Sequence, residues 1–164
     1  MGIRLEESAD RSALYAIYSA AFGQLAEADL VQDMCEDGDL VLSLIANADE
    51  PVGHVAYSRL TLHEAPSVKA AVLAPLAVAP SFQKQGIGAT LVQDSLKRLT
   101  DKHYDLVLVL GEPHYYSRFG FMPRLAERLK TPYDGPYLQA LALSDKGKDA
   151  RGSVSYAQAF VELE

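Results

Sequence analysis

Residues 80–90, with the sequence PSFQKQGIGAT, constrain the fold more than any other part of the chain. They join an apolar, strand-like run at 72–78 to a segment of helical periodicity that begins at Gly86. Gly86 and Gly88 carry no side chain, so a ligand can approach the backbone there, and the first N–H groups of a helix have no intrahelical partner. These free donors and the positive end of the helix dipole predict a binding site for an anion such as a diphosphate.

Two common phosphate-binding motifs do not match this loop. A Walker loop needs Lys and then Ser or Thr directly after its last glycine, whereas Ala89 and Thr90 follow Gly88. A dinucleotide fingerprint needs a third glycine where Leu91 stands and an acidic residue at the end of the next strand, whereas Asp105 opens that strand. A loop that uses glycine only for its turn geometry is the alternative interpretation.

A second motif lies downstream, where the strand-like run LVLVL at 106–110 is followed by GEPHYYSRFGF at 111–121. The order strand, Gln-x-x-Gly-x-Gly loop, helix, strand and Tyr-x-x-Phe-Gly-Phe resembles the GNAT superfamily of acyl-CoA-dependent N-acyltransferases. More narrowly, it is similar to the YhbS-like branch of predicted N-acetyltransferases. The segments GHV at 53–55, PLAVAP at 75–80 and GSVSYAQAF at 152–160 also fit that branch, so the resemblance covers nearly the whole chain.

The pattern of apolar residues predicts a mixed α/β fold with helices on both faces of the sheet. The expected strands are 3–5, 40–46, 52–62, 68–79, 106–110, 137–143 and 153–160, and the expected helices are one starting at Ser8 or Asp10, 26–37, 86–103 and a short one after 110. The strand at 106–110 is expected to run parallel to its neighbour across the helix. The length predicts one domain, 1–164. The resemblance implies the GNAT fold, whose fourth and fifth strands splay apart.

Pro75 lies inside the predicted fourth strand, although proline lacks the N–H that a central strand uses. One interpretation is a bulge that helps the strand to splay from its neighbour. The other is that Pro75 only disrupts pairing near an edge of the sheet.

Composition excludes several classes of protein. The apolar runs fall short of the roughly 20 residues that a membrane helix needs, and the acidic N-terminal segment is unlike a secretory signal, so we expect a cytoplasmic protein without a membrane partner. The net charge of −7 argues against nucleic-acid binding. The spacing of His, Cys and carboxylates predicts no metal site, and the single cysteine, Cys35, is expected to be a small packed residue.

The resemblance implies acetyl-CoA as the cofactor. Main-chain groups at 76–78 would pair with pantetheine like an added strand, and the Val78 N–H would hydrogen-bond the thioester carbonyl. Backbone N–H groups between 84 and 89 would hold the pyrophosphate, with Gln83 shaping the loop. The implied cofactor-binding residues are Leu76, Ala77, Val78, Gln83, Lys84, Gln85, Gly86, Ile87, Gly88, Ala89 and Thr90. The side chains of Lys84 and Arg118 have two interpretations: they contact the cofactor phosphates, or they are exposed charges, as charged residues on loops usually are.

Tyr116 is the implied general acid, because it lies four residues before Gly120, where many GNAT enzymes keep a tyrosine beside the cofactor sulfur. A phenol with an ordinary pKa of about 10 and a thiol of about 8.5 are close enough for proton transfer to the departing thiolate. Packing in the core is the alternative interpretation of this aromatic side chain.

The base for the amine is unassigned. The carboxylate that many relatives carry early in the fourth strand is missing from VLAP at 72–75, and GEP at 111–113 replaces the asparagine that many carry after the fifth strand. The candidates, acting directly or through water, are His54, Glu64, Glu112 and His114.

These patterns and the resemblance together predict an N-acetyltransferase that moves acetyl from acetyl-CoA to a primary amine of a small molecule or peptide by direct attack. The alternatives are a non-catalytic acyl-CoA-binding or sensing module, transfer of another acyl group, and acetylation of a protein N-terminus. Specificity for the acceptor is expected in segments 22–37, 63–67 and 125–136, which fold analogy does not translate into a substrate. The resemblance also allows a homodimer.

Overall fold

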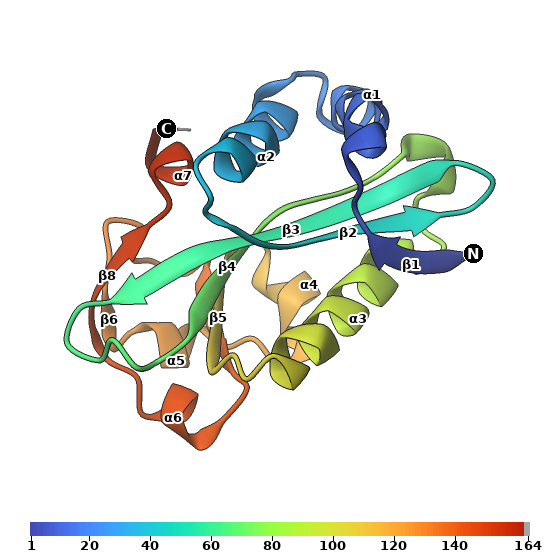
Figure 1. Ribbon diagram of the computed structural model, residues 1–164. Helices are drawn as coiled ribbons and strands as arrows, with labels where there is room; N and C mark the ends of the chain where they lie inside the picture. Colours follow the sequence, from blue (N-terminus) through green and yellow to red (C-terminus); the bar gives the residue numbers. More distant parts are fainter. Residues whose placement is uncertain (163–164) are drawn as a thin grey trace.

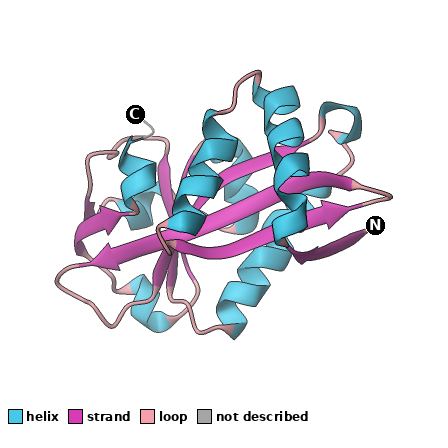
Figure 2. Ribbon diagram, turned by 45° about the horizontal axis from the view of Figure 1, so that its top comes forward, coloured by secondary structure: helices cyan, strands magenta, loops and turns pink. Residues whose placement is uncertain are grey.

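The computed structural model describes residues 1–162 and shows one long mixed sheet between two layers of helices (Figures 1 and 2). The strands are β1 (Gly2–Leu5), β2 (Leu40–Asn47), β3 (Pro51–Leu62), β4 (Ala70–Val78), β5 (Leu106–Leu110), β6 (Leu129–Lys130), β7 (Leu138–Ala142) and β8 (Gly152–Tyr156). The α-helices are α1 (Arg11–Phe22), α2 (Ala26–Glu36), α3 (Ile87–Asp101), α4 (Pro113–Tyr116), α5 (Pro123–Ala126), α6 (Asp145–Lys148) and α7 (Gln158–Glu162), with 3-10 turns η1 (Ser8–Asp10), η2 (Pro80–Phe82) and η3 (Ser117–Phe119).

The strand order β1-β2-β3-β4-β5-β7 confirms the predicted mixed α/β fold. β4 and β5 are parallel, as expected of strands joined through a helix, and the other pairs along this path are antiparallel. β8 pairs with the far end of β3 and with β6, which extends the sheet beyond that path.

The two faces of the sheet carry separate cores, because successive side chains of a strand point to opposite faces. Leu14 and Ile17 of α1 are buried with Ala56 of β3 on the face that α1 and α2 cover (Figure 1). Leu91 of α3 is buried with Tyr57 of β3 on the other face. The middle of β3 therefore lies between two layers, and its polar residues His54 and Ser58 are buried.

β4 and β5 splay apart after a short stretch of pairing. Their register joins Ala70 to Leu106 and ends where Leu73 meets Val109, although β4 continues to Val78. The pairing of β3 with β4 shifts at the same place, so that β4 has one residue more than β3 between its flanking pairs. This bulge contains Pro75, and it confirms the first interpretation of that proline.

Gly53 of β3 seats the start of α3 on the sheet. A Cβ atom there would lie 3.1 Å from Leu91 Cδ1 and 3.2 Å from Ile87 Cγ2. Both side chains belong to α3 and are buried. The absence of a side chain at Gly53 thus sets how closely the first turns of α3 approach β3.

The C-terminal segment corrects the prediction of a strand over 153–160. β8 ends at Tyr156, and a helix, α7, follows. Ala159 and Phe160 are both buried in the core cluster that contains Met34 of α2. A strand would turn two successive side chains to opposite faces, whereas a helix can bring both to the same neighbour.

Cys35 is exposed, which corrects the expectation of a packed cysteine. The buried face of α2 is formed by Ala28, Leu30, Val31 and Met34. Cys35 follows Met34 by about 100° around the helix axis and therefore faces outward.

Two absences hold for the part of the chain that the structure describes. Within residues 1–162, no helix combines the length and apolarity needed to cross a bilayer. Across the same residues, no three His, Cys, Asp or Glu side chains gather as metal ligands would.

We expect Gly53→Val to destabilise the fold, because its methyl groups must displace Leu91 and Ile87. Overpacking of this kind lowers the free energy of unfolding by about 1–3 kcal/mol. Chemical denaturation measures the change, with Gly2→Val as the control because a Cβ at Gly2 has no heavy atom within 4 Å. Equal stability of the two variants would contradict the role assigned to Gly53.

Candidate active site

The glycine loop ends in a helix start with free donors. Gly86 caps α3 with φ of 81°, and Lys84 also has a positive φ of 65°. The first helical hydrogen bond runs from Thr90 N to Gly86 O at 3.0 Å. Within residues 1–162, no protein acceptor bonds to the N–H groups of residues 84–89. This is the arrangement that the sequence predicts for an anion site.

A pocket of about 440 Å³ lies over these donors. Its lining residues are Val78, Phe82, Gln83, Lys84, Gly86, Ile87, Gly88, Ala89, Tyr115 and Arg118. Seven residues of the predicted cofactor-binding set are among them, and Leu76, Ala77, Gln85 and Thr90 are not. The structure therefore brings the end of β4, the loop and the start of α3 together.

Side-chain bonds fix the shape of the loop. Gln83 Nε2 donates to the Val78 carbonyl at 2.9 Å, which ties the loop to the end of β4. Thr90 Oγ1 donates to the Gly86 carbonyl at 2.9 Å and so bonds within the helix. Gln85 is exposed, and Ile87 is buried with the α3 core, so any contact of Ile87 with an anion is through its main chain.

Tyr115 and Arg118 form a wall of the pocket, and of the two only Tyr115 was missed by sequence reasoning. A Cβ on Gly88 would lie 2.9 Å from the Tyr115 hydroxyl, so glycine is required for this approach of α4 to α3. The Arg118 guanidinium lies 4.4 Å from the Tyr115 ring centre, and its Nε donates to the Tyr115 carbonyl at 3.2 Å. The sequence signal that could have indicated this contact is the i, i+3 spacing of Tyr115 and Arg118, which places an arginine over an aromatic ring on the same side of a helical turn.

The edge of β4 beyond the bulge has free amides. Ala79 N donates to Val52 O on β3 at 2.8 Å, so the Ala77 amide, two residues earlier, also points toward β3. The amides of Leu76 and Val78 then point the other way, toward the space that β5 leaves. An extended ligand can pair there like an added strand.

Tyr116 lies over the end of β5. A Cβ on Gly111 would be 2.5 Å from Tyr116 Cε2, so the ring depends on glycine at this position. Tyr116 also contacts the rings of Tyr115, Phe119 and Phe121. Burial, and then the neighbouring Tyr115, raise the pKa of Tyr116 to about 12. Its phenol keeps its proton at neutral pH.

Two other buried tyrosines, one on each face of the sheet, also have raised pKa values. Burial and then the charges of Glu27 and Glu6 raise the pKa of Tyr18 on the α1 face. On the α3 face, burial raises the pKa of Tyr57, and its hydrogen bond with Ser95 opposes this. Tyr116 itself packs against the α3-face core and against Gly111, the residue after β5.

The four candidate bases are not brought together. His54 is fully buried, and burial followed by the charge of Arg11 lowers its pKa to about 3, so it is neutral. Glu64 accepts from Ser153 N at 3.0 Å and lies in the turn before β4, at the opposite end of that strand from the loop. Glu112 and His114 are exposed at the start of α4.

Comparison with known proteins agrees with this geometry. Residues 11–121 match the model of the acetyltransferase (GNAT) family. The chain is 39% identical over 123 residues to the N-acetyltransferase YhbS of Escherichia coli K12, covering 74% of this chain and 73% of that protein. It is 35% identical over 137 residues to the N-acetyltransferase YjhQ of the same organism, covering 81% and 74%.

Two solved structures are similar over almost their whole length. Escherichia coli YhbS in complex with CoA has a TM-score of 0.90 and 33% identity, covering 98% of this chain and 91% of that one. A GNAT acetyltransferase of Brucella melitensis in complex with acetyl-CoA has a TM-score of 0.81 and 29% identity, covering 97% of each chain. By sequence, fold and the architecture of its site, the chain belongs to the GNAT family of N-acetyltransferases.

Proposed function

We propose that this protein transfers the acetyl group of acetyl-CoA to a primary amine by direct attack, without a covalent enzyme intermediate. One observation carries the proposal. The unpaired N–H groups at the start of α3 open onto the same pocket as Val78, the last residue of β4. A ligand with a diphosphate and an extended arm fits both features at once.

The residues present fit the coenzyme. The diphosphate would accept from the N–H groups of Gly86, Gly88 and Ala89, with Lys84 and Arg118 beside them as cations. The arm would pair with the free edge of β4 at Leu76 and Val78. The similarity to proteins solved with CoA and with acetyl-CoA supports this assignment.

Acetyl-CoA supplies an activated acetyl group, and the protein supplies position and protons. The Val78 N–H points into the opening between β4 and β5, where it would polarise the thioester carbonyl. Tyr116 keeps its proton, so it would protonate the departing sulfur. Val78 is the last residue of β4, and Tyr116 lies over the end of β5, the neighbouring strand.

The acceptor that the charge distribution favours is a cationic amine. The net charge is −7, and α2 carries Glu27, Asp29, Asp33 and Glu36 without a basic residue. An acidic surface raises the local concentration of a cation. α2 belongs to the segment 22–37, where acceptor specificity is expected.

Calorimetric titration and thiol release test the proposal together. We expect heat on titration with CoA and acetyl-CoA, and free thiol when acetyl-CoA is mixed with members of a panel of primary amines. Binding without turnover would favour the alternative of an acyl-CoA-sensing module. No heat with either compound would overturn the proposal.

We predict that Gly88→Ala weakens acetyl-CoA binding without unfolding the protein. The new methyl group displaces the Tyr115 hydroxyl, which is the mobile end of a side chain, into the pocket. The expected loss is about tenfold in Kd, or about 1.4 kcal/mol, by calorimetry. Adding Tyr115→Phe removes the displaced oxygen and should restore much of the affinity. No restoration would mean that the methyl group itself blocks the ligand.

We predict that Tyr116→Phe lowers the rate of transfer and leaves the affinity for acetyl-CoA unchanged. Loss of a general acid costs about 10²–10⁴-fold in kcat. Tyr115→Phe is the matched control, because it removes a hydroxyl from the adjacent residue on the pyrophosphate side of the site. If both variants keep wild-type kcat, Tyr116 is a packing residue and the acid is elsewhere.

A further inference from the structure

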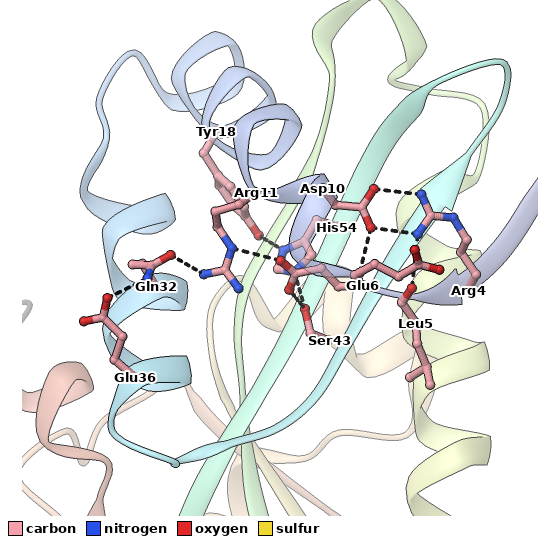
Figure 3. Close-up of polar contacts among 11 residues, drawn as sticks. Arg4, Leu5, Glu6, Asp10, Arg11, Tyr18, Gln32, Glu36, Ser43 and His54 are labelled. Atoms are coloured by element: carbon pink, nitrogen blue, oxygen red, sulfur yellow. Dashed lines mark hydrogen bonds and ion pairs between the residues drawn. The ribbon is translucent and has the colours of Figure 1, made fainter.

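A buried chain of hydrogen bonds crosses the layers beside β4 (Figure 3). The Tyr18 hydroxyl on α1 is 2.7 Å from His54 Nδ1 on β3, and His54 Nε2 is 2.7 Å from Ser43 Oγ on β2. Ser43 Oγ donates to Glu6 Oε1 at 2.5 Å. Arg11 Nε is 3.0 Å from the other oxygen of Glu6. Tyr18, His54 and Ser43 are at most 9% exposed.

The chain has a single direction. An ionised Glu6 can only accept, so the Ser43 hydroxyl donates to it. The Ser43 oxygen then accepts from His54 Nε2–H, and His54 Nδ1 accepts from the Tyr18 hydroxyl. The neutral imidazole is consistent with burial and Arg11, which lower the His54 pKa, while Asp10 opposes them. Every proton in the chain therefore points from Tyr18 toward Glu6.

The two ends of the chain lie in different places. Ser43, Glu6 and Arg11 line a surface pocket of about 310 Å³, through which a proton can reach water. At the other end, Tyr18 is fully buried in the core cluster that contains Ala77 of β4. Ala77 lies between the two β4 residues whose amides face the opening beside β5. The chain thus runs from the core beside the end of β4 to a pocket at the surface.

We infer that Tyr18, His54, Ser43 and Glu6 form a proton relay that deprotonates the acceptor ammonium, in place of the missing base. This inference rests on the proposed function. Tyr18 is the group that contacts the amine, and the other three act through it. The acceptor reaches Tyr18 by displacing Phe22, whose ring stacks on Tyr18 at 5.9 Å and is 48% exposed at the end of α1.

The protons balance as follows. The ammonium gives a proton to the Tyr18 oxygen while the Tyr18 proton passes to His54 Nδ1. The His54 Nε2 proton passes to Ser43, and the Ser43 proton passes to the Glu6 carboxylate. The products are a neutral amine, a neutral imidazole of the opposite tautomer and a protonated Glu6, which releases its proton to water. When the amide forms, the nitrogen loses a second proton. This proton replaces the one that Tyr116 delivers to the sulfur, so the phenol is restored.

The test uses Glu6→Gln, which keeps an oxygen that accepts from Ser43 but cannot take up a proton. Tyr18→Phe removes the first member of the chain. Ser95→Ala is the matched control, because Ser95 forms a buried 2.6 Å bond with Tyr57 on the opposite face of the sheet. Acetyl transfer is followed with butylamine, which is an ammonium ion at neutral pH, and with 2,2,2-trifluoroethylamine, which loses its proton far more readily.

We expect Glu6→Gln and Tyr18→Phe to lower kcat/KM for butylamine by about 10²-fold at pH 7. The deficit should shrink about tenfold for each unit of rising pH, since the variants depend on amine that is already neutral. Transfer to trifluoroethylamine and the affinity for acetyl-CoA should stay near wild type. An equal deficit with both amines at every pH, or no deficit, would overturn the relay.

A measurement without turnover gives a second test. ¹⁵N NMR of the wild-type protein should show a neutral His54 with its proton on Nε2, and a proton on Nδ1 would reverse the chain and refute the inference. Failure of the proposed function is distinguishable, because it would be seen as absent heat with acetyl-CoA. If only the relay is wrong, acetyl-CoA still binds with heat, and the variants show the same pH profile as the wild type.

Discussion

The site depends on the unequal pairing of the two edges of β4. β3 holds one edge along most of its length, whereas β5 releases the other after Leu73. A strand that lost both partners would not stay extended, and one that kept both would have no free amides. β4 stays paired with β3 on both sides of the bulge at Pro75. Beyond the bulge, β4 is therefore ordered along one edge and unpaired along the other, and the proposed reaction takes place beside the unpaired edge.

The anion pocket depends on contacts in which a glycine replaces a side chain. Gly53 lets α3 approach β3, Gly88 lets Tyr115 approach α3, and Gly111 lets Tyr116 lie on the end of β5. Each contact joins an element of the pocket to the next. At each contact a side chain packs directly against the backbone of a glycine. These close contacts fix the positions of the start of α3, α4 and the end of β5 relative to one another and leave them little freedom to move.

The polar chain from Tyr18 to Glu6 has a cost that its geometry offsets. Burying a hydroxyl, an imidazole and a second hydroxyl without partners would cost about 1–3 kcal/mol each. Each has partners from a different element, so α1, β2, β3 and the loop after β1 are joined through polar contacts. Arg11 is both the first residue of α1 and the ion partner of Glu6, which anchors that helix to the chain.

Local patterns in the sequence determined the order of most elements, the parallel pair and the helix start after the glycine loop, because periodicity and glycine act over a few residues. For Pro75 they left a bulge and a disrupted edge as alternatives, and the pairing of β3 with β4 decided for the bulge. Tertiary structure decided the rest. It made 158–162 a helix through packing on α2, turned Cys35 outward, placed Tyr115 and Arg118 over the loop, and enclosed His54 as a neutral link between α1 and β2. These outcomes depend on contacts between residues far apart in the chain, whose burial and partners no local pattern records.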